Sequence, residues 1–112
     1  MAKAERIFRD KFILTVGAAE TSKEAAFIRE GELSALFVQV PNFTNAVTVI
    51  VSIKDSDGYE FVVSSSLAKA QNHRVAVAWP LPGVQTIVVT VSGVPGGTGG
   101  DVVVVAFGRA LG

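Results

Sequence analysis

The residues best suited to catalysis are one histidine and a run of serines. His73 is the only histidine in the 112-residue chain, so one chain cannot provide a multi-histidine metal site. A catalytic triad would require His73 to meet Ser65 or Ser66 and a carboxylate in space. Neither serine stands in a Gly-x-Ser-x-Gly turn, the context that exposes the nucleophile of many hydrolases. We therefore expect a solvated loop histidine and no catalytic residue, and a small hydrolase using these groups is the less favoured alternative.

Two glycine-containing segments resemble ligand-binding loops in part. Gly96–Gly100 is as dense in glycine as a phosphate-binding loop, but a valine-rich strand follows it in place of the Lys-Ser or Lys-Thr and the helix that a P-loop needs. Asp55, Asp57 and Gly58 match part of a calcium loop, whose distal bidentate glutamate is missing. Asp-Gly is also a common hairpin signal. We predict that both segments are turns, and we expect no metal and no cofactor.

Trp79 is the residue best suited to bind a partner through its side chain. A broad amphipathic ring stacks on a sugar or anchors a protein interface, although core packing at a strand end is the favoured interpretation here. The neighbouring Pro80, Leu81 and Pro82 add apolar surface. The candidates for an interface or binding surface are Trp79, Leu81, Tyr59 and Phe43.

Composition excludes several classes of protein. A length of 112 residues fits one domain that spans residues 1–112. With 49% hydrophobic and 18% charged residues, the chain is apolar for a soluble protein, and we expect part of its surface to meet a partner. Ten basic and ten acidic residues cancel, so we expect no direct nucleic-acid partner and no membrane partner. The absence of cysteine excludes a disulfide scaffold, a thiolate metal site and a cysteine nucleophile.

The amino-terminal segment has mixed charge. Residues 1–6 lack the apolar run of a secretory signal, and residues 1–10 are a candidate extended arm that becomes ordered against a neighbour. The longest apolar runs, such as Val102–Phe107, fall far short of the roughly 20 residues that a membrane-spanning helix needs. We therefore expect a soluble chain.

Short runs of strand-forming residues follow one another at similar spacing. Val, Ile and Thr are stiff at χ1 and suit a pleated, half-buried surface. The clearest alternation places Val47, Val49, Val51 and Ile53 on one face. The runs that we predict as strands are Lys11–Val16, Ala26–Arg29, Leu33–Val40, Val47–Ile53, Tyr59–Ser64, Arg74–Trp79, Gln85–Ser92 and Asp101–Phe107.

Turn residues separate these runs. Asp55–Gly58 predicts a hairpin, because Asp hydrogen-bonds its own backbone and Gly accepts positive φ. Glu30–Glu32 is predicted as a turn, and Pro80–Gly83 as the end of a strand. Gly17–Glu24 is either a loop or one short helical turn. Without a strong amphipathic helix, the pattern favours an all-β fold, an antiparallel β-sandwich or jelly roll of about seven or eight strands.

Most of the chain after Glu32 resembles a known kind of protein. The segments Val40–Thr48, Ile53–Gly58, Pro80–Gly83 and Val91–Gly100 are similar to turn motifs of small structural proteins encoded by tailed bacteriophages. The resemblance implies a β-sandwich component of the virion, in the head or at the neck or tail. It supplies no functional residues to transfer.

The physical pattern and the resemblance lead to one expected function. We expect a non-enzymatic structural protein that decorates the capsid or forms part of the head, neck, connector or tail. Its partners would be other virion proteins and further copies of itself in a homo-oligomer, and its location the virion, assembled in the host cytoplasm. The alternative is a carbohydrate-binding module in which Trp79 and Tyr59 hold a glycan.

Overall fold

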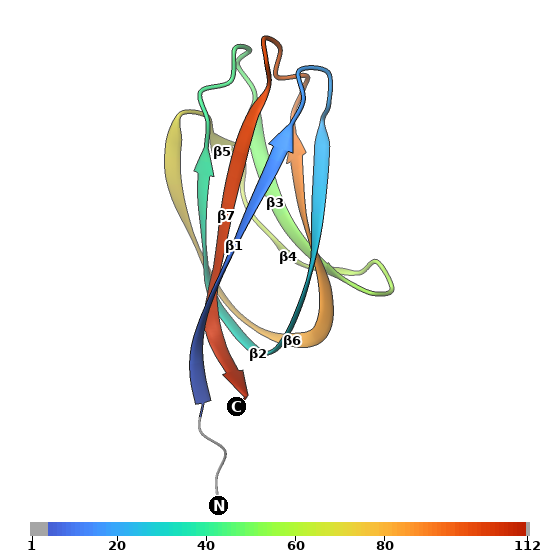
Figure 1. Ribbon diagram of the computed structural model, residues 1–112, viewed down its shortest axis with the longest axis vertical. Coiled ribbons are helices and arrows are strands. Elements are labelled where there is room, and N and C mark those ends of the chain that lie inside the picture. The colour runs from blue at the N-terminus through green and yellow to red at the C-terminus, as the bar shows by residue number, and fades with distance from the viewer. Residues whose placement is uncertain (1–4, 112) are drawn as a thin grey trace, which may run out of the picture.

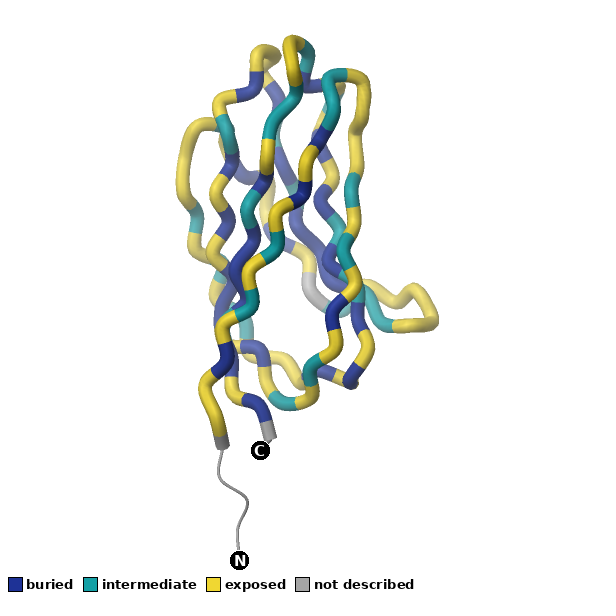
Figure 2. The backbone as a smooth tube through the Cα atoms, viewed as in Figure 1, coloured by how far each residue is buried: buried dark blue, intermediate teal, exposed yellow. Residues whose placement is uncertain are grey.

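Period-two alternation of buried and exposed side chains runs along the strands of the computed structural model, which describes residues 5–111 (Figure 2). No helix occurs in this range, and the predicted all-β antiparallel fold is confirmed. The seven strands are β1 (Glu5–Val16), β2 (Ser22–Val40), β3 (Thr48–Asp55), β4 (Glu60–Val63), β5 (Leu67–Ala68), β6 (Gln71–Val91) and β7 (Gly100–Leu111).

The strands form one hydrogen-bonded sheet that folds over on itself. Its order is β1-β7-β2-β6-β3-β4, and β5 pairs with β3. The two longest strands, β2 and β6, pair along their whole length and curve together at one end of the molecule (Figure 1). Within β2, only residues 31–39 pair with β7, and within β6, only residues 85–91 pair with β3.

This pairing defines the two layers of the sandwich. The first layer contains β1, β7, residues 31–40 of β2 and residues 71–80 of β6. The second layer contains residues 22–30 of β2, residues 83–91 of β6, and β3, β4 and β5.

At two places where the sequence predicted the end of a strand, the structure has a continuous, curved strand. Glu30–Glu32 is no reversal but lies inside β2, so the two runs predicted on either side of it form one strand. Pro80–Gly83 lies inside β6 in the same way. Residues 80–84 pair with β2 on one side and have no ladder to β3 on the other, and an open strand edge tolerates proline, which lacks an N–H donor.

Gly31 shows why a turn-forming residue stands at the curve. Its φ of 139° belongs to the region that favours glycine. A Cβ at this position would collide with the carbonyl oxygen of Arg109 in β7 and would lie 2.9 Å from the Cα of Ala110. The glycine therefore lets the bent β2 approach β7 closely enough to pair.

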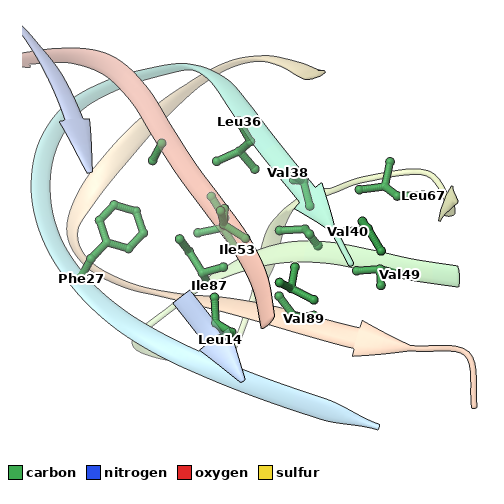
Figure 3. Close-up of a cluster of buried hydrophobic side chains, with 14 of the residues drawn as sticks. Leu14, Phe27, Leu36, Val38, Val40, Val49, Ile53, Leu67, Ile87 and Val89 are labelled. Atoms are coloured by element: carbon green, nitrogen blue, oxygen red, sulfur yellow. The ribbon is translucent and has the colours of Figure 1, made fainter. Parts of the chain in front are cut away.

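The core lies between the two layers. Side chains from both layers point toward one another there, as Figure 3 shows for Leu14, Leu36, Ile53 and Ile87. The face predicted from the alternation of Val47, Val49, Val51 and Ile53 is buried, as expected. The largest fully buried side chains are Phe43, Leu33, Leu36, Ile53, Ile87, Gln85, Val16, Val38, Val40, Val49, Val51 and Val89.

Side chains close one open side of the sandwich, where β1 of the first layer lies beside β2 of the second. The rings of Phe12 and Phe27 pack with centroids 5.2 Å apart. Arg29 donates two hydrogen bonds to Asp10, from Nε at 3.1 Å and from Nη2 at 2.7 Å, and its guanidinium lies 4.7 Å from the centroid of Phe8. The hydrogen bonds to Asp10 raise the pKa of Arg29 above its usual value.

The loops agree with most of the turn predictions. Asp55 Oδ1 accepts hydrogen bonds from the N–H groups of Asp57 and Tyr59, which forms the expected hairpin turn. Gly96, Gly97 and Gly99 have positive φ in the predicted glycine-rich loop. Residues 17–21 form a loop and β2 begins at Ser22, so the loop alternative holds there.

The amino-terminal prediction is only partly within the described range. Glu5–Asp10, which belong to the candidate arm, are paired with β7 along β1. Residues 1–4 lie outside the described residues. Over residues 5–111 there is no helix of the length and apolar character needed to cross a membrane.

Candidate functional surface

Alternation along the first layer produces an outward surface that we call the first face. In β1, Phe8, Leu14 and Val16 point into the core, so Arg9 and Lys11 point outward. In β7 and β2 the same alternation points half-buried Val103 and Phe107 and exposed Phe37 and Gln39 outward. The strand register then sets which of these side chains are neighbours.

Two cross-strand rows make the centre of the first face. One row runs Lys11, Val105, Phe37, Arg74 across β1, β7, β2 and β6. The next row contains Arg9 opposite Phe107. Residues opposite one another on neighbouring strands have Cβ atoms about 5 Å apart, so cationic and apolar side chains are interleaved.

The aromatic side chains of these rows contact one another. The rings of Phe37 and Phe107 pack edge to face with centroids 5.0 Å apart. The guanidinium carbon of Arg9 lies 5.8 Å from the Phe107 centroid, within the range of a cation–π contact. Phe37 remains 43% exposed. Beside it is an open hollow of about 260 Å³, lined by Arg9, Lys11, Phe37, Val38, Gln39, Asn72, His73, Val103 and Val105.

Among the side chains that the structure describes, the first face carries more basic than acidic ones. The basic residues are Arg9, Lys11, Arg74 and Arg109, and the acidic ones Glu32 and Asp101. Within residues 5–111, neither Lys11 nor Arg74 forms an ion pair. Asp101 accepts a hydrogen bond of 2.7 Å from Thr15 at one end of the face, away from the hollow.

The outward surface of the second layer, which we call the second face, has the opposite balance. Ile28 lies directly opposite Val84, and they are 79% and 53% exposed. Glu30 follows two residues after Ile28 on the same side of β2. The charged residues of the second face are Glu24, Glu30, Glu60 and Lys54, and the ammonium of Lys54 lies 3.2 Å from a carboxylate oxygen of Glu24.

The four residues predicted for an interface separate into two exposed and two buried. Trp79 is 46% exposed and stacks on Phe61 with centroids 6.2 Å apart, so the favoured prediction of core packing for Trp79 is wrong. Tyr59 is 75% exposed beside the β3–β4 turn. Phe43 and Leu81 are buried in the core cluster, which removes their side chains from the surface of this chain.

The histidine and Ser64, the first residue of the serine run, have backbone partners. His73 lies in β6 and not in the predicted loop, and its Nε2 is 2.8 Å from the carbonyl oxygen of Ala68. Ser64 Oγ donates to the carbonyl oxygen of Ser65 at 2.8 Å and accepts from the N–H of Val51 at 2.9 Å. These groups hold β5 and the end of β4 against the sheet.

The predicted turns also have structural partners. In the described part of the chain, no group of three or more His, Cys, Asp or Glu side chains is placed to hold a metal ion. The N–H of Gly96 donates to the carbonyl oxygen of Ala18, and the side chain of Asn45 donates to that of Val94. The glycine-rich loop therefore packs against the two neighbouring loops at one end of the sandwich.

Sequence reasoning missed the first face, although one signal was present. Leu36, Val38 and Val40 share the buried face of β2, which places Phe37 on the opposite side as an exposed aromatic residue. Its basic neighbours come from β1 and β6, about 26 residues before it and 37 after it in the sequence, and only the strand register brings them together.

Comparisons with known proteins support the fold alone. No protein-family profile matches the sequence, and no curated protein matches it significantly. Among solved structures, a Bacillus endospore appendage protein, from a family described as disulfide-linked pili, has a TM-score of 0.58 at 12% identity. The match covers 100% of this chain and 93% of that one.

Two further structures are similar over most of this chain. Latent PorU from Porphyromonas gingivalis matches with a TM-score of 0.51 at 11% identity, over 98% of this chain but only 13% of PorU. The SPBc2 prophage-derived protein YomS has a TM-score of 0.45 at 18% identity, over 94% of this chain and 96% of that one, a likeness too weak to carry an argument. The matches to the endospore appendage protein and to PorU agree with a β-sandwich domain.

Proposed function

We propose that this chain is a non-enzymatic structural protein of a bacteriophage particle, acting by association with copies of itself and with other virion proteins. Its place would be the capsid surface, as a decoration, or the head, neck, connector or tail. It would be assembled in the host cytoplasm and remain in the virion.

One observation carries the proposal, namely large apolar side chains that are exposed on an otherwise well-packed sandwich. Single exposed apolar residues scattered over a surface are normal, but contiguous ones indicate surfaces that associate. Here exposed Phe37 packs against half-buried Phe107 on the first face, and exposed Ile28 lies opposite exposed Val84 on the second. The large exposed apolar residues in the described range are Ile7, Ile13, Ile28, Phe37, Tyr59, Val63, Trp79, Val84 and Val94.

Two further points support the proposal. The turn motifs after Glu32 resemble those of small structural proteins of tailed bacteriophages. The likeness to the endospore appendage protein is compatible with a sandwich that builds assemblies. That family is described as disulfide-linked, whereas this chain has no cysteine, so its own association would have to be held by non-covalent contacts.

The experiment that tests the proposal is a mass-spectrometric search for the chain in purified phage particles from cells that express it during infection. Stoichiometric recovery with the particles, followed by localisation in particle images, is the expected result. A second sample, washed in high salt, separates integral from adsorbed protein. Absence from clean, infectious particles would contradict the proposal.

Exposed Trp79 supports carbohydrate binding as a second candidate. Its ring is backed by Phe61, and an indole held in one orientation is a suitable platform for a sugar. On a glycan array, specific binding that is lost in Trp79→Ala and kept in the control Val94→Ala, a change at an exposed loop residue, would favour this function. Uniformly negative arrays would dismiss it.

A further inference from the structure

We infer that copies of this chain associate face to back, with the first face of one copy against the second face of the next. The inference rests on the proposed function, association between subunits, and specifies the surfaces that carry it. The occupant of the hollow beside Phe37 is then a second copy of the same chain.

Charge complementarity is the first argument. Among the residues whose side chains the structure describes, the first face has four basic and two acidic residues, and the second has three acidic and one basic. Two copies that met through their first faces would bring two predominantly basic surfaces together. Within the described range, neither Lys11 nor Arg74 has an ion-pair partner in its own chain that would offset its charge. Like charges brought together at an interface oppose association, whereas opposite charges steer it.

The apolar groups are arranged in a matching way. The hollow of the first face has Phe37, Val103 and Val105 among Arg9 and Lys11. On the second face, the pair Ile28 and Val84 stands exposed with Glu30 at its edge. An apolar contact ringed by complementary charges is the usual organisation of an interface.

The geometry has a consequence for the assembly. A contact that joins two different surfaces is heterologous, so each copy that binds through one face still offers the other. Repetition gives a ring if the rotation closes and a filament if it does not. This mode suits a component that is present in many copies.

Charge reversal tests the inference. Arg74→Glu changes the first face and Glu30→Lys the second, and neither residue has an ion-pair partner in the described range. Each single variant should associate about tenfold more weakly in sedimentation velocity at low salt. The double variant should recover most of the loss, because the two faces are complementary again with the signs exchanged.

Mixing the two single variants gives the most specific readout. The unchanged first face of Glu30→Lys can still bind the unchanged second face of Arg74→Glu, and the two altered faces are complementary to each other with the signs exchanged. The mixture should therefore assemble with the two variants alternating, although each variant alone associates weakly. Symmetric dimers through a single face would respond to only one of the reversals, and that result would overturn the inference.

An apolar substitution and its control complete the test. Ile28→Asp should abolish growth of the assembly, whereas Val94→Asp, which changes an exposed valine in a loop outside both faces, should leave it intact. Unchanged thermal unfolding would show that each variant is folded. A wild-type chain that stays monomeric at about 100 μM, or association that is insensitive to both reversals, would overturn the inference.

The two failures are distinguishable. Recovery of the chain in phage particles together with a monomer in solution would reject the face-to-back contact and leave the proposed function standing. Face-to-back association of a chain that is absent from particles would do the reverse.

Discussion

The contact between Asp10 and Arg29 gives the sharpest test of how the sandwich is closed. It joins β1 of the first layer to β2 of the second, where no backbone ladder connects them. Two unit charges about 3 Å apart attract by roughly 5 kcal/mol at an effective dielectric constant of about 20. The side chains retain 33% and 26% of their exposure, so desolvation is incomplete and solvent screening removes most of that energy. Because Arg29 donates to both carboxylate oxygens of Asp10, we expect this pair to couple more strongly than an ordinary surface ion pair, with a coupling energy of about 1.5 kcal/mol.

A double-mutant cycle with Asp10→Asn and Arg29→Gln measures that coupling by urea unfolding. Asp10→Asn alone should lower Tm by about 6 °C in a domain of this size. The matched control is the cycle for Glu24 and Lys54, which make a single contact at 3.2 Å between more exposed side chains and should couple by about 0.3 kcal/mol. Equal coupling energies in the two cycles would refute the claim that the first pair closes the sandwich.

Three further predictions concern stability. Gly31→Ala should destabilise the fold by about 3 kcal/mol in urea unfolding, because a Cβ there meets the backbone of β7; a change below 0.5 kcal/mol would contradict the close approach. Ile53→Ala should cost about 3 to 4 kcal/mol in the same assay, against less than about 0.5 kcal/mol for exposed Ile28→Ala, and similar costs would contradict the assigned core. Hydrogen bonds from Lys23 and from the N–H of Gly17 hold the pKa of Glu20 below its usual value, so its stabilisation is present above the unfolded pKa and fades as pH falls through the folded one. The difference in Tm between wild type and Glu20→Gln should therefore be largest near pH 7 and shrink towards about pH 3, and a difference that grew on acidification would show the sign to be wrong.

The local part of the fold could be predicted because it depends on neighbouring residues. Alternation determines the buried face of β3, and the Asp55–Gly58 sequence contains the donors and acceptors of its own turn. The curves at Gly31 and Pro80–Gly83 could not be predicted in this way, because the same residue types suit a reversal and a bend. The difference is decided by strand β7, whose residue Arg109 lies 78 positions away from Gly31.

The exposure of the candidate surface residues also depended on packing that adjacent sequence does not reveal. Phe43 lies in a loop and Leu81 at the curve of β6, and nothing local indicates that they complete the core. Trp79 has the apolar neighbours of a core residue, yet it lies at the curve of β6 and covers Phe61 with nearly half of its surface exposed. For these residues, exposure depends on how the two layers meet and not on the adjacent sequence.

Net charge illustrates what composition alone cannot show. Ten basic and ten acidic residues cancel, and a cancelled total excludes a strong overall field. It does not exclude separation, because the sandwich places Lys11 and Arg74 on one outward surface and Glu30 on the other. At the distance of a contacting partner, which is within one Debye length at physiological salt, each surface acts by its own charge. A chain that is neutral as a whole can therefore still discriminate between its two faces, and raising the salt concentration should weaken its association even though its net charge is zero.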